Sequence, residues 1–194
     1  MTTFSVARSE LILGGQKSGK SRRAEGLAQG WLAQSPEHRA VLIATAQPWD
    51  NEMRERIARH QKDRGERVPG MQTIEEPLQL AQAMAQHSRT GTLVVVDCLT
   101  LWLTNLLMPA ENSDKKEAAV PYLLAQTAMI LKAIEEAAGP VVLVGNEIGL
   151  GVIPMGSETR AFVDALGQLN QEVARVCDRV TLMAAGLPLM LKDN

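Results

Sequence analysis

The sequence predicts an α/β fold in which a mainly parallel sheet is flanked by helices. Short, continuously apolar runs alternate with longer segments of helical periodicity, and this alternation is typical of βαβ units. The runs lack the in–out alternation of half-exposed strands, which indicates strands covered on both faces. A glycine-rich loop joins the first apolar run to the first helical segment. The length fits one domain, residues 1–194.

The strand predictions depend on apolar runs bounded by polar or glycine-containing segments. Five strong runs lie at 10–15, 40–45, 92–97, 140–146 and 179–185. A weaker strand is expected near 71–74, and a last edge strand at 187–192. No internal repeat or low-complexity segment interrupts this order.

Helical patterns fill the intervals between the runs. The predicted helices are 21–34, 51–64, 77–87, 118–138 and 157–177. Asp50 is a good N-cap type for the second helix, and Pro77 suits the first position of the third. Trp102 and Asn105 follow the third strong run on a further expected helix, where packing is the default role for Trp102. The polar segment 109–117 is expected to be an exposed excursion.

Composition limits the classes of partner. The chain has 22 acidic and 20 basic residues, so its net charge of −2 gives no indication of a nucleic-acid partner. Two distant cysteines, Cys98 and Cys177, suggest neither a disulfide framework nor a metal site, and they favour a reducing cytoplasm. No signal peptide is evident. The most apolar stretch is too polar and too short for a membrane span. We therefore expect a soluble cytoplasmic protein.

The glycine-rich loop matches the Walker A pattern G-x-x-x-x-G-K-[ST]. It comprises Gly14, Gly15, Gln16, Lys17, Ser18, Gly19, Lys20 and Ser21. Glycines let successive N–H groups turn toward phosphate oxygens, and the following helix offers its positive end. Lys20 is expected to reach the β- and γ-phosphates, and Ser21 to supply a hydroxyl to Mg²⁺. The loop in this setting predicts a P-loop NTPase fold, RecA-like, whereas a chance match would be a simple turn.

Asp97 ends the apolar run Leu93–Asp97 and has the form of a Walker B carboxylate. Ligands bind at the carboxyl ends of strands in such sheets, so Asp97 is expected to hold Mg²⁺ directly or through water. Many strands end in Asp for structural reasons alone, and the Walker A loop upstream favours the metal role.

The basic segment 51–64 is a second candidate site. Basic residues surround His60 in it: Arg54, Arg56, Arg59, Lys62 and Arg64. At helical spacing Arg56, His60 and Arg64 share a face. A histidine can attack phosphorus, and these cations could neutralise a triphosphate. The alternative is a solvated helix face of mixed charge, because acidic residues balance the segment.

Four segments together resemble a known family. They read GGQKSGKSRRAE, LIATAQPWDNEMRERIARHQKDR, VVVDCLTLWLTNLL and VVLVGNEIGLGVIPMGSETRAFVDALGQLNQEVARVCDRV. Over nearly the whole chain, and in the same order, these resemble the bifunctional adenosylcobinamide kinase/adenosylcobinamide-phosphate guanylyltransferase family of cobalamin biosynthesis. The phosphate loop is generic, whereas the blocks R-I-x-x-H-x-x-x-R, D-C-L-T-L-W-x-x-N and N-E-x-G-x-G-x-x-P are more specific.

The resemblance implies two reactions. A nucleoside triphosphate, ATP or GTP, phosphorylates the aminopropanol hydroxyl of adenosylcobinamide. GTP then transfers GMP to that phosphate, which gives adenosylcobinamide-GDP and pyrophosphate. In the family this second transfer passes through a guanylylated histidine, and the R-I-x-x-H spacing places that role on His60. The resemblance also implies a homo-oligomer, a trimer.

Further nucleotide contacts are implied by the same resemblance. They are Ala44, Thr45 and Ala46, then Gln61, Lys62, Asp63 and Arg64, and finally Glu75 of a T-x-E pattern. A carboxylate suits the paired N–H donors of guanine. The alternatives are that Thr45 only caps a strand and that Glu75 or Glu76 only begins the helix at Pro77.

The chain departs from the family pattern after the histidine block. Gly65 follows Arg64 where the family has Pro, Met71 stands where it has Trp, and the segment is about three residues longer. This departure leaves the assignment of Glu75 open. It does not affect the assignments of His60, Lys20 and Asp97.

Two points stay open from the sequence. The loop that begins at Asn146 and Glu147 could contact a ligand or could be a turn whose glycines serve only the backbone. Two other functions also fit the motifs: a P-loop kinase of another small alcohol without guanylyl transfer, and a non-catalytic nucleotide-dependent binding module.

Overall fold

The computed structural model describes residues 5–48, 50–108, 116–152 and 154–194. Its elements in chain order are β1 Ser9–Gly14, α1 Lys20–Gln34, β2 Arg39–Ala44, α2 Asn51–Arg67, β3 Gln72–Glu75, α3 Leu80–His87, β4 Thr92–Asp97, α4 Leu99–Leu107, α5 Lys116–Glu135, β5 Val141–Val144, α6 Ser157–Val176, β6 Arg179–Ala184 and β7 Leu187–Asp193. Every predicted strand and helix is found, and most of them have shifted ends.

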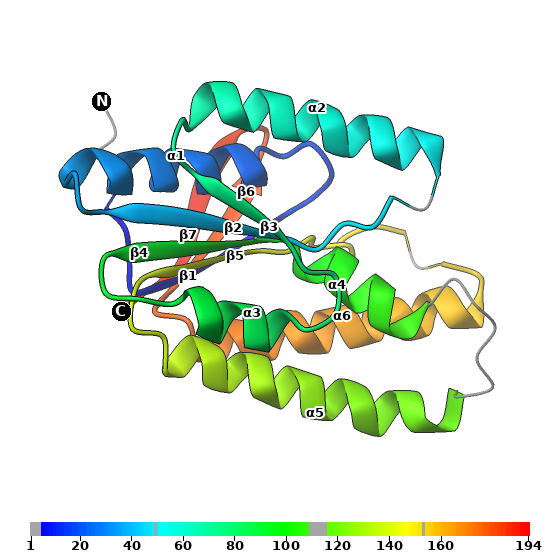
Figure 1. The fold of residues 1–194 in the computed structure, drawn as a ribbon. Helices are drawn as coiled ribbons and strands as arrows, with labels where there is room; N and C mark the ends of the chain where they lie inside the picture. The colour runs from blue at the N-terminus through cyan, green and yellow to red at the C-terminus, as the bar shows by residue number, and fades with distance from the viewer. Residues whose placement is uncertain (1–4, 49, 109–115, 153) are drawn as a thin grey trace.

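The strands form one seven-stranded sheet in the order β3-β2-β4-β5-β1-β6-β7. All neighbouring pairs are parallel except β6 and β7, which are antiparallel. Helices α1 and α2 cover one face of the sheet, and α3, α4, α5 and α6 cover the other (Figure 1). The parallel strands end at the same edge, which is the right-hand side of Figure 1, and this carboxyl edge is where such sheets bind ligands.

Several helix ends differ from their predictions by one to three residues. Helix α3 begins at Leu80 instead of Pro77, and in the turn before it the Glu76 carboxylate accepts hydrogen bonds from the N–H groups of Leu78 and Gln79. Helix α2 continues to Arg67, since no proline follows Arg64. The predicted excursion at 109–117 lies mostly outside the described residues, and Lys116 and Glu117 belong to α5.

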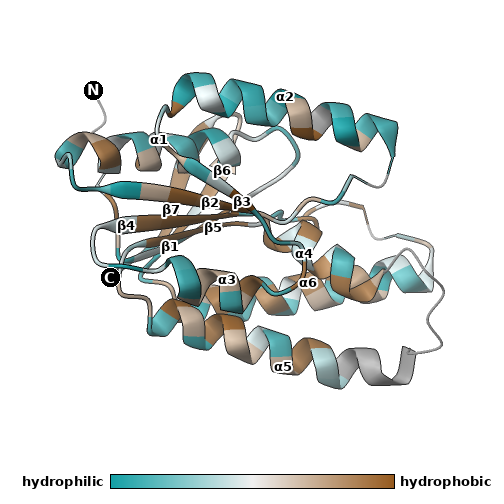
Figure 2. Ribbon diagram, in the orientation of Figure 1, coloured by the Kyte–Doolittle hydropathy of each residue, from teal (hydrophilic) through white to brown (hydrophobic). Residues whose placement is uncertain are grey.

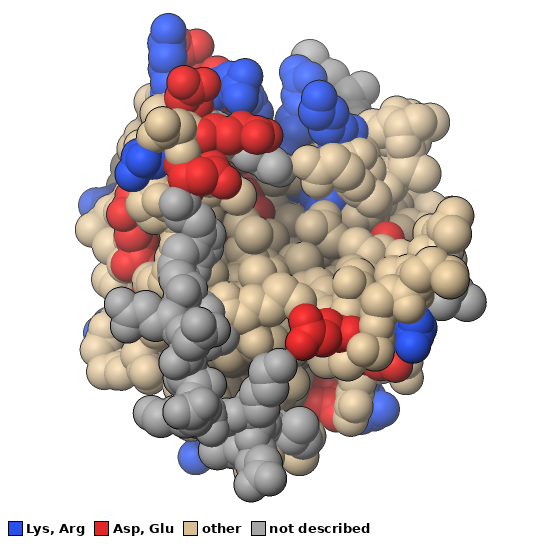
Figure 3. All heavy atoms as spheres, turned by 90° about the vertical axis from the view of Figure 1, so that its right-hand side faces the viewer, with Lys and Arg blue, Asp and Glu red and all other residues tan. Residues whose placement is uncertain are grey.

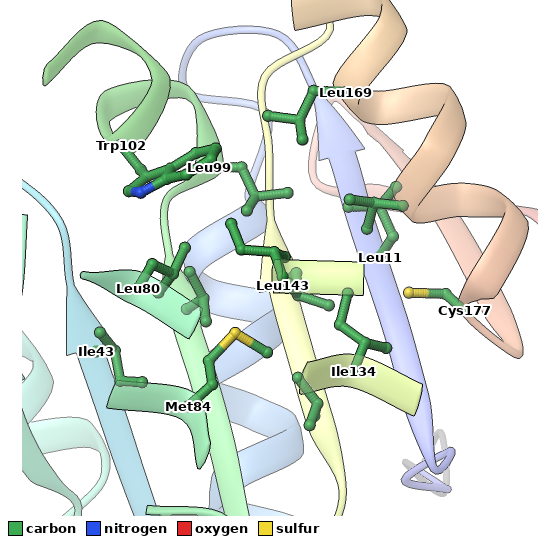
Figure 4. Close-up of a cluster of buried hydrophobic side chains, with 14 of the residues drawn as sticks. Leu11, Ile43, Leu80, Met84, Leu99, Trp102, Ile134, Leu143, Leu169 and Cys177 are labelled. Atoms are coloured by element: carbon green, nitrogen blue, oxygen red, sulfur yellow. The ribbon is translucent and has the colours of Figure 1, made fainter. Parts of the chain in front are cut away.

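Two apolar clusters fill the two sides of the sheet. One joins the sheet to α3, α4, α5 and α6, and its members include Leu11, Ile43, Leu80, Met84, Leu99, Trp102, Ile134, Leu143, Leu169 and Cys177 (Figure 4). The other joins the sheet to α1 and includes Ile12, Ala24, Leu27, Leu42, Val95, Val142 and Val144. Because successive strand residues point to opposite faces, this division shows which face each edge residue occupies.

The hydropathy of the elements agrees with a core centred on the sheet. The central strands are hydrophobic along their length, whereas α2 is mostly hydrophilic (Figure 2). In the described part of the chain, no helix has both the length and the apolar character that a membrane crossing requires.

Trp102 is completely buried and donates from Nε1 to the Leu78 carbonyl at 3.0 Å, so its packing role is confirmed.

Candidate active site at the carboxyl edge

The phosphate loop connects β1 to α1 and depends on backbone shapes that favour glycine. Gly14 and Gly19 have φ of +152° and +101°. A Cβ atom at Gly14 would stand 2.5 Å from the Met183 carbonyl oxygen and 2.6 Å from Ser18 Oγ. The pattern therefore needs glycine at Gly14 for lack of space as well as for loop conformation. Within the loop, Gly15, Gln16 and Lys17 are exposed, whereas Ser18 and Lys20 are buried.

The turn between β6 and β7 supports this loop from behind. The Gly186 N–H donates to the Ser18 carbonyl at 3.0 Å. A Cβ atom at Gly19 would lie 3.3 Å from the Gly186 Cα atom. Sequence reasoning missed this support, because the two segments are far apart in the chain and neither motif points to the other.

Lys20 lies folded beneath its own loop. Its Nζ donates to the Gly15 carbonyl at 2.6 Å and to Ser18 Oγ at 3.5 Å. Desolvation lowers the pKa of this ammonium, and the nearby Cys98 and Asp97 groups oppose that shift. A desolvated cation with only neutral partners in hydrogen-bond contact is well suited to receive a phosphate.

Asp97 faces the same side of the sheet as the phosphate loop. Val95, two residues earlier, belongs to the cluster beneath α1, so strand alternation directs Asp97 to that side. Ser21 lies half-buried in the first turn of α1. A hydroxyl and a carboxylate are the hard oxygen ligands that Mg²⁺ accepts, together with water and phosphate oxygens. No group of three or more His, Cys, Asp or Glu side chains suited to a metal occurs among the described residues.

The ends of three neighbouring strands align at this edge. Ala44 is in register with Glu75 on one side and with Asp97 on the other. Gln61 Nε2 on α2 donates to Glu75 Oε1 at 3.0 Å. The structure thus brings together Ala44, Gln61, Glu75 and Asp97, which sequence reasoning had selected separately. Glu76 instead accepts hydrogen bonds in the turn before α3, whereas Glu75 ends β3 at this edge.

Thr45 is engaged in the protein interior. It is completely buried, and its hydroxyl both donates to the Cys98 carbonyl at 2.7 Å and accepts from the Cys98 N–H at 2.9 Å. The Asn105 amide donates to the Thr45 carbonyl at 2.8 Å. The Thr45 side chain therefore joins β2 to the segment after Asp97, which is the structural alternative that the sequence left open. Ala46, the next residue, is half-buried.

The C-terminal half of α2 contacts α1. Arg67 forms an ion pair with Glu25 of α1 and a second with Asp63 at 3.2 Å. Arg64 is 8% exposed. Desolvation lowers the pKa of its guanidinium, and Asp97 and Glu25 oppose that shift. Arg64 therefore brings a positive charge from α2 toward the Asp97 carboxylate.

His60 lies on α2 between the half-buried Ile57 and the buried Arg64, three and four residues away. At helical spacing the three residues lie on one side of the helix. The His60 side chain is exposed, as are Gln61 and Lys62. Among the described residues the imidazole has no hydrogen-bond partner, and nothing joins it to the phosphate loop. Arg56, predicted to share its face, has a side chain outside the described set.

The carboxyl edge of the sheet faces the viewer in Figure 3, and the surface there has a hollow. Charged side chains gather along the top of this view, where α2 lies, and the surface below them is mostly uncharged (Figure 3). The segment after β5 reaches this edge as well, since the Glu147 N–H donates to the Gly14 carbonyl at 3.1 Å. The site therefore combines a phosphate loop, a carboxylate at a strand end and a basic helix.

Comparisons with known proteins place nearly the whole chain among relatives of known family. The family model "Cobinamide kinase / cobinamide phosphate guanyltransferase" matches residues 10–191. The bifunctional adenosylcobalamin biosynthesis protein CobP of Pseudomonas aeruginosa is 45% identical, over 95% of this chain and 98% of that protein. CobU of Escherichia coli, with the same description, is 31% identical over 94% of this chain and 98% of its own length.

Among solved structures, the flagellar accessory protein FlaH from Methanocaldococcus jannaschii has a TM-score of 0.51 and 12% identity. The match covers 97% of this chain and 80% of that one. At this identity the likeness concerns the fold alone, and it confirms the predicted mainly parallel sheet flanked by helices. The family match over residues 10–191 does not depend on this structural likeness. It shows that the chain belongs to the cobinamide kinase/cobinamide phosphate guanyltransferase family.

Proposed function

We propose that this chain is a bifunctional transferase that acts on adenosylcobinamide within a single domain, residues 1–194. It phosphorylates the aminopropanol hydroxyl with a nucleoside triphosphate, and it then transfers GMP from GTP to the resulting phosphate. The observation that carries the proposal is the buried Lys20 beneath a Walker A loop on the Asp97 side of the sheet, in a chain that matches the family over residues 10–191.

In the first reaction the loop N–H groups and Lys20 bind the β- and γ-phosphates. The substrate hydroxyl oxygen attacks the γ-phosphorus and releases its proton to solvent. The bond from that phosphorus to the bridging oxygen breaks, and the nucleoside diphosphate departs. Arg64 and Lys20 offset the negative charge that spreads over the phosphate oxygens. Positioning and electrostatics supply most of the rate in such transfers.

Ser21 and Asp97 are the residues that would hold Mg²⁺. Bound there, the ion would neutralise charge on the triphosphate. The half-buried Asp97 and Ser21 fit this role because each offers an oxygen ligand and the triphosphate completes the set.

In the second reaction His60 acts as the nucleophile. Its imidazole nitrogen attacks the α-phosphorus of GTP, the bond to the β-phosphate oxygen breaks, and pyrophosphate departs. The phosphate oxygen of adenosylcobinamide-phosphate then attacks the same phosphorus and breaks its bond to nitrogen, which frees His60 and yields adenosylcobinamide-GDP. The exposed imidazole, without an internal partner in the described structure, supports this role.

Nucleotide contacts complete the proposal. Glu75 receives the N1–H and N2–H₂ donors of guanine, while Ala44, Ala46 and the residues from Gln61 to Arg64 surround the nucleotide. The alignment of Ala44, Glu75 and Asp97 supports this assignment. We also propose that the protein works in the cytoplasm and assembles as a homotrimer, so that a neighbouring subunit helps to enclose the corrinoid.

The experiment is a stepwise turnover assay in which the corrinoid products are identified by mass. With ATP alone, adenosylcobinamide should gain one phosphate. With GTP added, it should become adenosylcobinamide-GDP with release of pyrophosphate. Phosphorylation without any GDP product would instead indicate a plain kinase, and slow nucleotide hydrolysis without either product would indicate a non-catalytic nucleotide-dependent binding module.

A further inference from the structure

Strand β5 brings one more polar residue to the site. In the sheet, β5 lies between β4 and β1, and Val144 is in register with both Asp97 and Ile12. The contact with β1 continues beyond the strand, since the Gly145 N–H donates to the Ile12 carbonyl at 2.9 Å and the Glu147 N–H to the Gly14 carbonyl at 3.1 Å. Asn146 therefore lies at the carboxyl edge, between the phosphate loop and Asp97.

Strand alternation assigns the face that Asn146 occupies. Val144 belongs to the cluster beneath α1. A Cβ atom on Gly145 would point to the opposite face, where it would meet Leu13 Cδ2 at 3.1 Å and Asn170 Oδ1 at 3.2 Å. The extended contact with β1 keeps the alternation through the next residue. Asn146 is thus directed to the face that carries α1, Lys20 and Asp97.

The backbone of Asn146 is held from two helices. Its N–H donates to Thr100 Oγ1 of α4 at 2.9 Å, and its carbonyl accepts from Asn170 Nδ2 of α6 at 3.0 Å. Thr100 and Asn170 are 8% and 4% exposed, so both anchors are fixed by packing. The Asn146 side chain is half-buried, and its carboxamide has no hydrogen-bond partner among the described residues. A held backbone with a free amide is the arrangement expected of a preorganised ligand contact.

We propose that the Asn146 carboxamide donates a hydrogen bond to the terminal phosphoryl group of the bound nucleoside triphosphate. The phosphate loop and Lys20 cradle the phosphates on one side, and Asp97 lies on the other, so the terminal phosphate is the part of the ligand that faces Asn146. A neutral amide donor there distinguishes a triphosphate from a diphosphate. It also stabilises the charge on the phosphoryl oxygens during transfer. The effect on rate rests on the proposed kinase reaction, whereas the effect on binding does not.

Equilibrium binding of two nucleotides tests the contact without any corrinoid. Calorimetry in a His60→Ala background, where no imidazole can attack the α-phosphorus, compares GDP with the β,γ-imido analogue of GTP, each with Mg²⁺. Asn146→Ala should weaken the triphosphate analogue about tenfold and change GDP binding less than about twofold, because one hydrogen bond to a charged group is lost. Asn146→Asp keeps the size of the side chain but places a carboxylate beside the phosphate, so it should weaken the analogue further.

Gln82→Ala is the matched control, since it also removes a carboxamide; Gln82 is exposed and lies on α3 at the other face of the sheet. It should leave both dissociation constants unchanged. Equal weakening of GDP and the analogue in Asn146→Ala, or no weakening of either, would overturn the proposal. Asn146→Asp covers the case in which the alanine variant fails to fold.

The phosphoryl-transfer rate gives the second test. Asn146→Ala should lower kcat about 100-fold, the cost of one donor to a developing charge. A wild-type protein that does not phosphorylate adenosylcobinamide would contradict the proposed function, yet the binding comparison would still decide the role of Asn146.

Discussion

Gln61 on α2 donates a hydrogen bond to Glu75 at the end of β3, with a distance of 3.0 Å between Nε2 and Oε1. This bond connects the helix that carries His60 to the edge of the sheet. It also occupies the carboxylate that we assign to guanine. A guanine that donates to both carboxylate oxygens would compete with Gln61 for Oε1.

The first prediction concerns guanine selection by Glu75. Glu75→Gln should raise the KM for GTP in guanylyl transfer about tenfold, because an amide cannot accept both guanine donors, and it should leave ATP-dependent phosphorylation nearly unchanged. Steady-state kinetics with each nucleotide measures both effects. Glu76→Gln is the control, since Glu76 caps the turn before α3 and should alter stability without altering KM. Equal KM changes for GTP and ATP in Glu75→Gln would contradict the assignment.

The second prediction concerns space at the phosphate loop. Gly14→Ala should lower the free energy of unfolding by about 2–4 kcal/mol, because the added Cβ would meet the Met183 carbonyl in a crowded turn. Gly15→Ala should change it by less than about 1 kcal/mol, since nothing lies within 4 Å of that Cβ position. Urea unfolding of the two variants provides the comparison. Similar losses in both would show that the loop is not packed as described.

The third prediction concerns Lys20. Lys20→Met should abolish the rise in melting temperature that GTP with Mg²⁺ produces, while the nucleotide-free protein remains folded. Phosphoryl transfer should fall at least about 100-fold. Differential scanning fluorimetry with and without nucleotide measures the first effect. A variant that keeps its GTP-induced shift would show that Lys20 does not bind the triphosphate.

Lys20 also predicts a pH dependence of stability. Burial lowers its pKa below the unfolded value of 10.5, so the folded state binds fewer protons on this group than the unfolded state. The free energy of unfolding contributed by Lys20 therefore rises with pH between the folded and unfolded pKa values. Urea unfolding from neutral pH to about pH 10 should show a smaller rise in Lys20→Met than in the parent. Identical slopes would contradict the burial of a charged Lys20.

The fourth prediction concerns the contact between α1 and α2. Arg67→Ala should lower stability by only about 1 kcal/mol, because the pair with Glu25 is partly exposed on the arginine side. Amide hydrogen exchange should nevertheless accelerate in α2 and not in α1. Uniform acceleration across both helices would show that Arg67 supports the whole fold and not the position of α2.

Much of the fold follows from local patterns. The apolar runs predict each strand because parallel strands are buried on both faces, and β4 occupies the predicted residues 92–97. The Walker A loop and Asp97 were found from the sequence, since their chemistry requires a short, specific pattern. Glu75 and Gln61 were selected only through the family resemblance, and their mutual hydrogen bond was not foreseen.

What sequence reasoning missed depends on pairing between distant segments. The support of the phosphate loop by Gly186 and the anchoring of Asn146 by Thr100 and Asn170 depend on strand order. Strand order is a tertiary property, and periodicity along one segment carries no information about it.

Intact-protein mass after incubation with GTP and Mg²⁺, without corrinoid, tests the central claim most directly. The spectrum should be recorded under neutral or alkaline conditions, because a phosphorus–nitrogen bond is labile to acid. We predict one GMP adduct on the parent protein and none on His60→Ala, with His87→Ala, which removes a histidine on α3 at the other face of the sheet, as the matched control that keeps the adduct. Absence of an adduct on a parent protein that binds GTP, or an adduct that persists in His60→Ala, would contradict guanylyl transfer through His60.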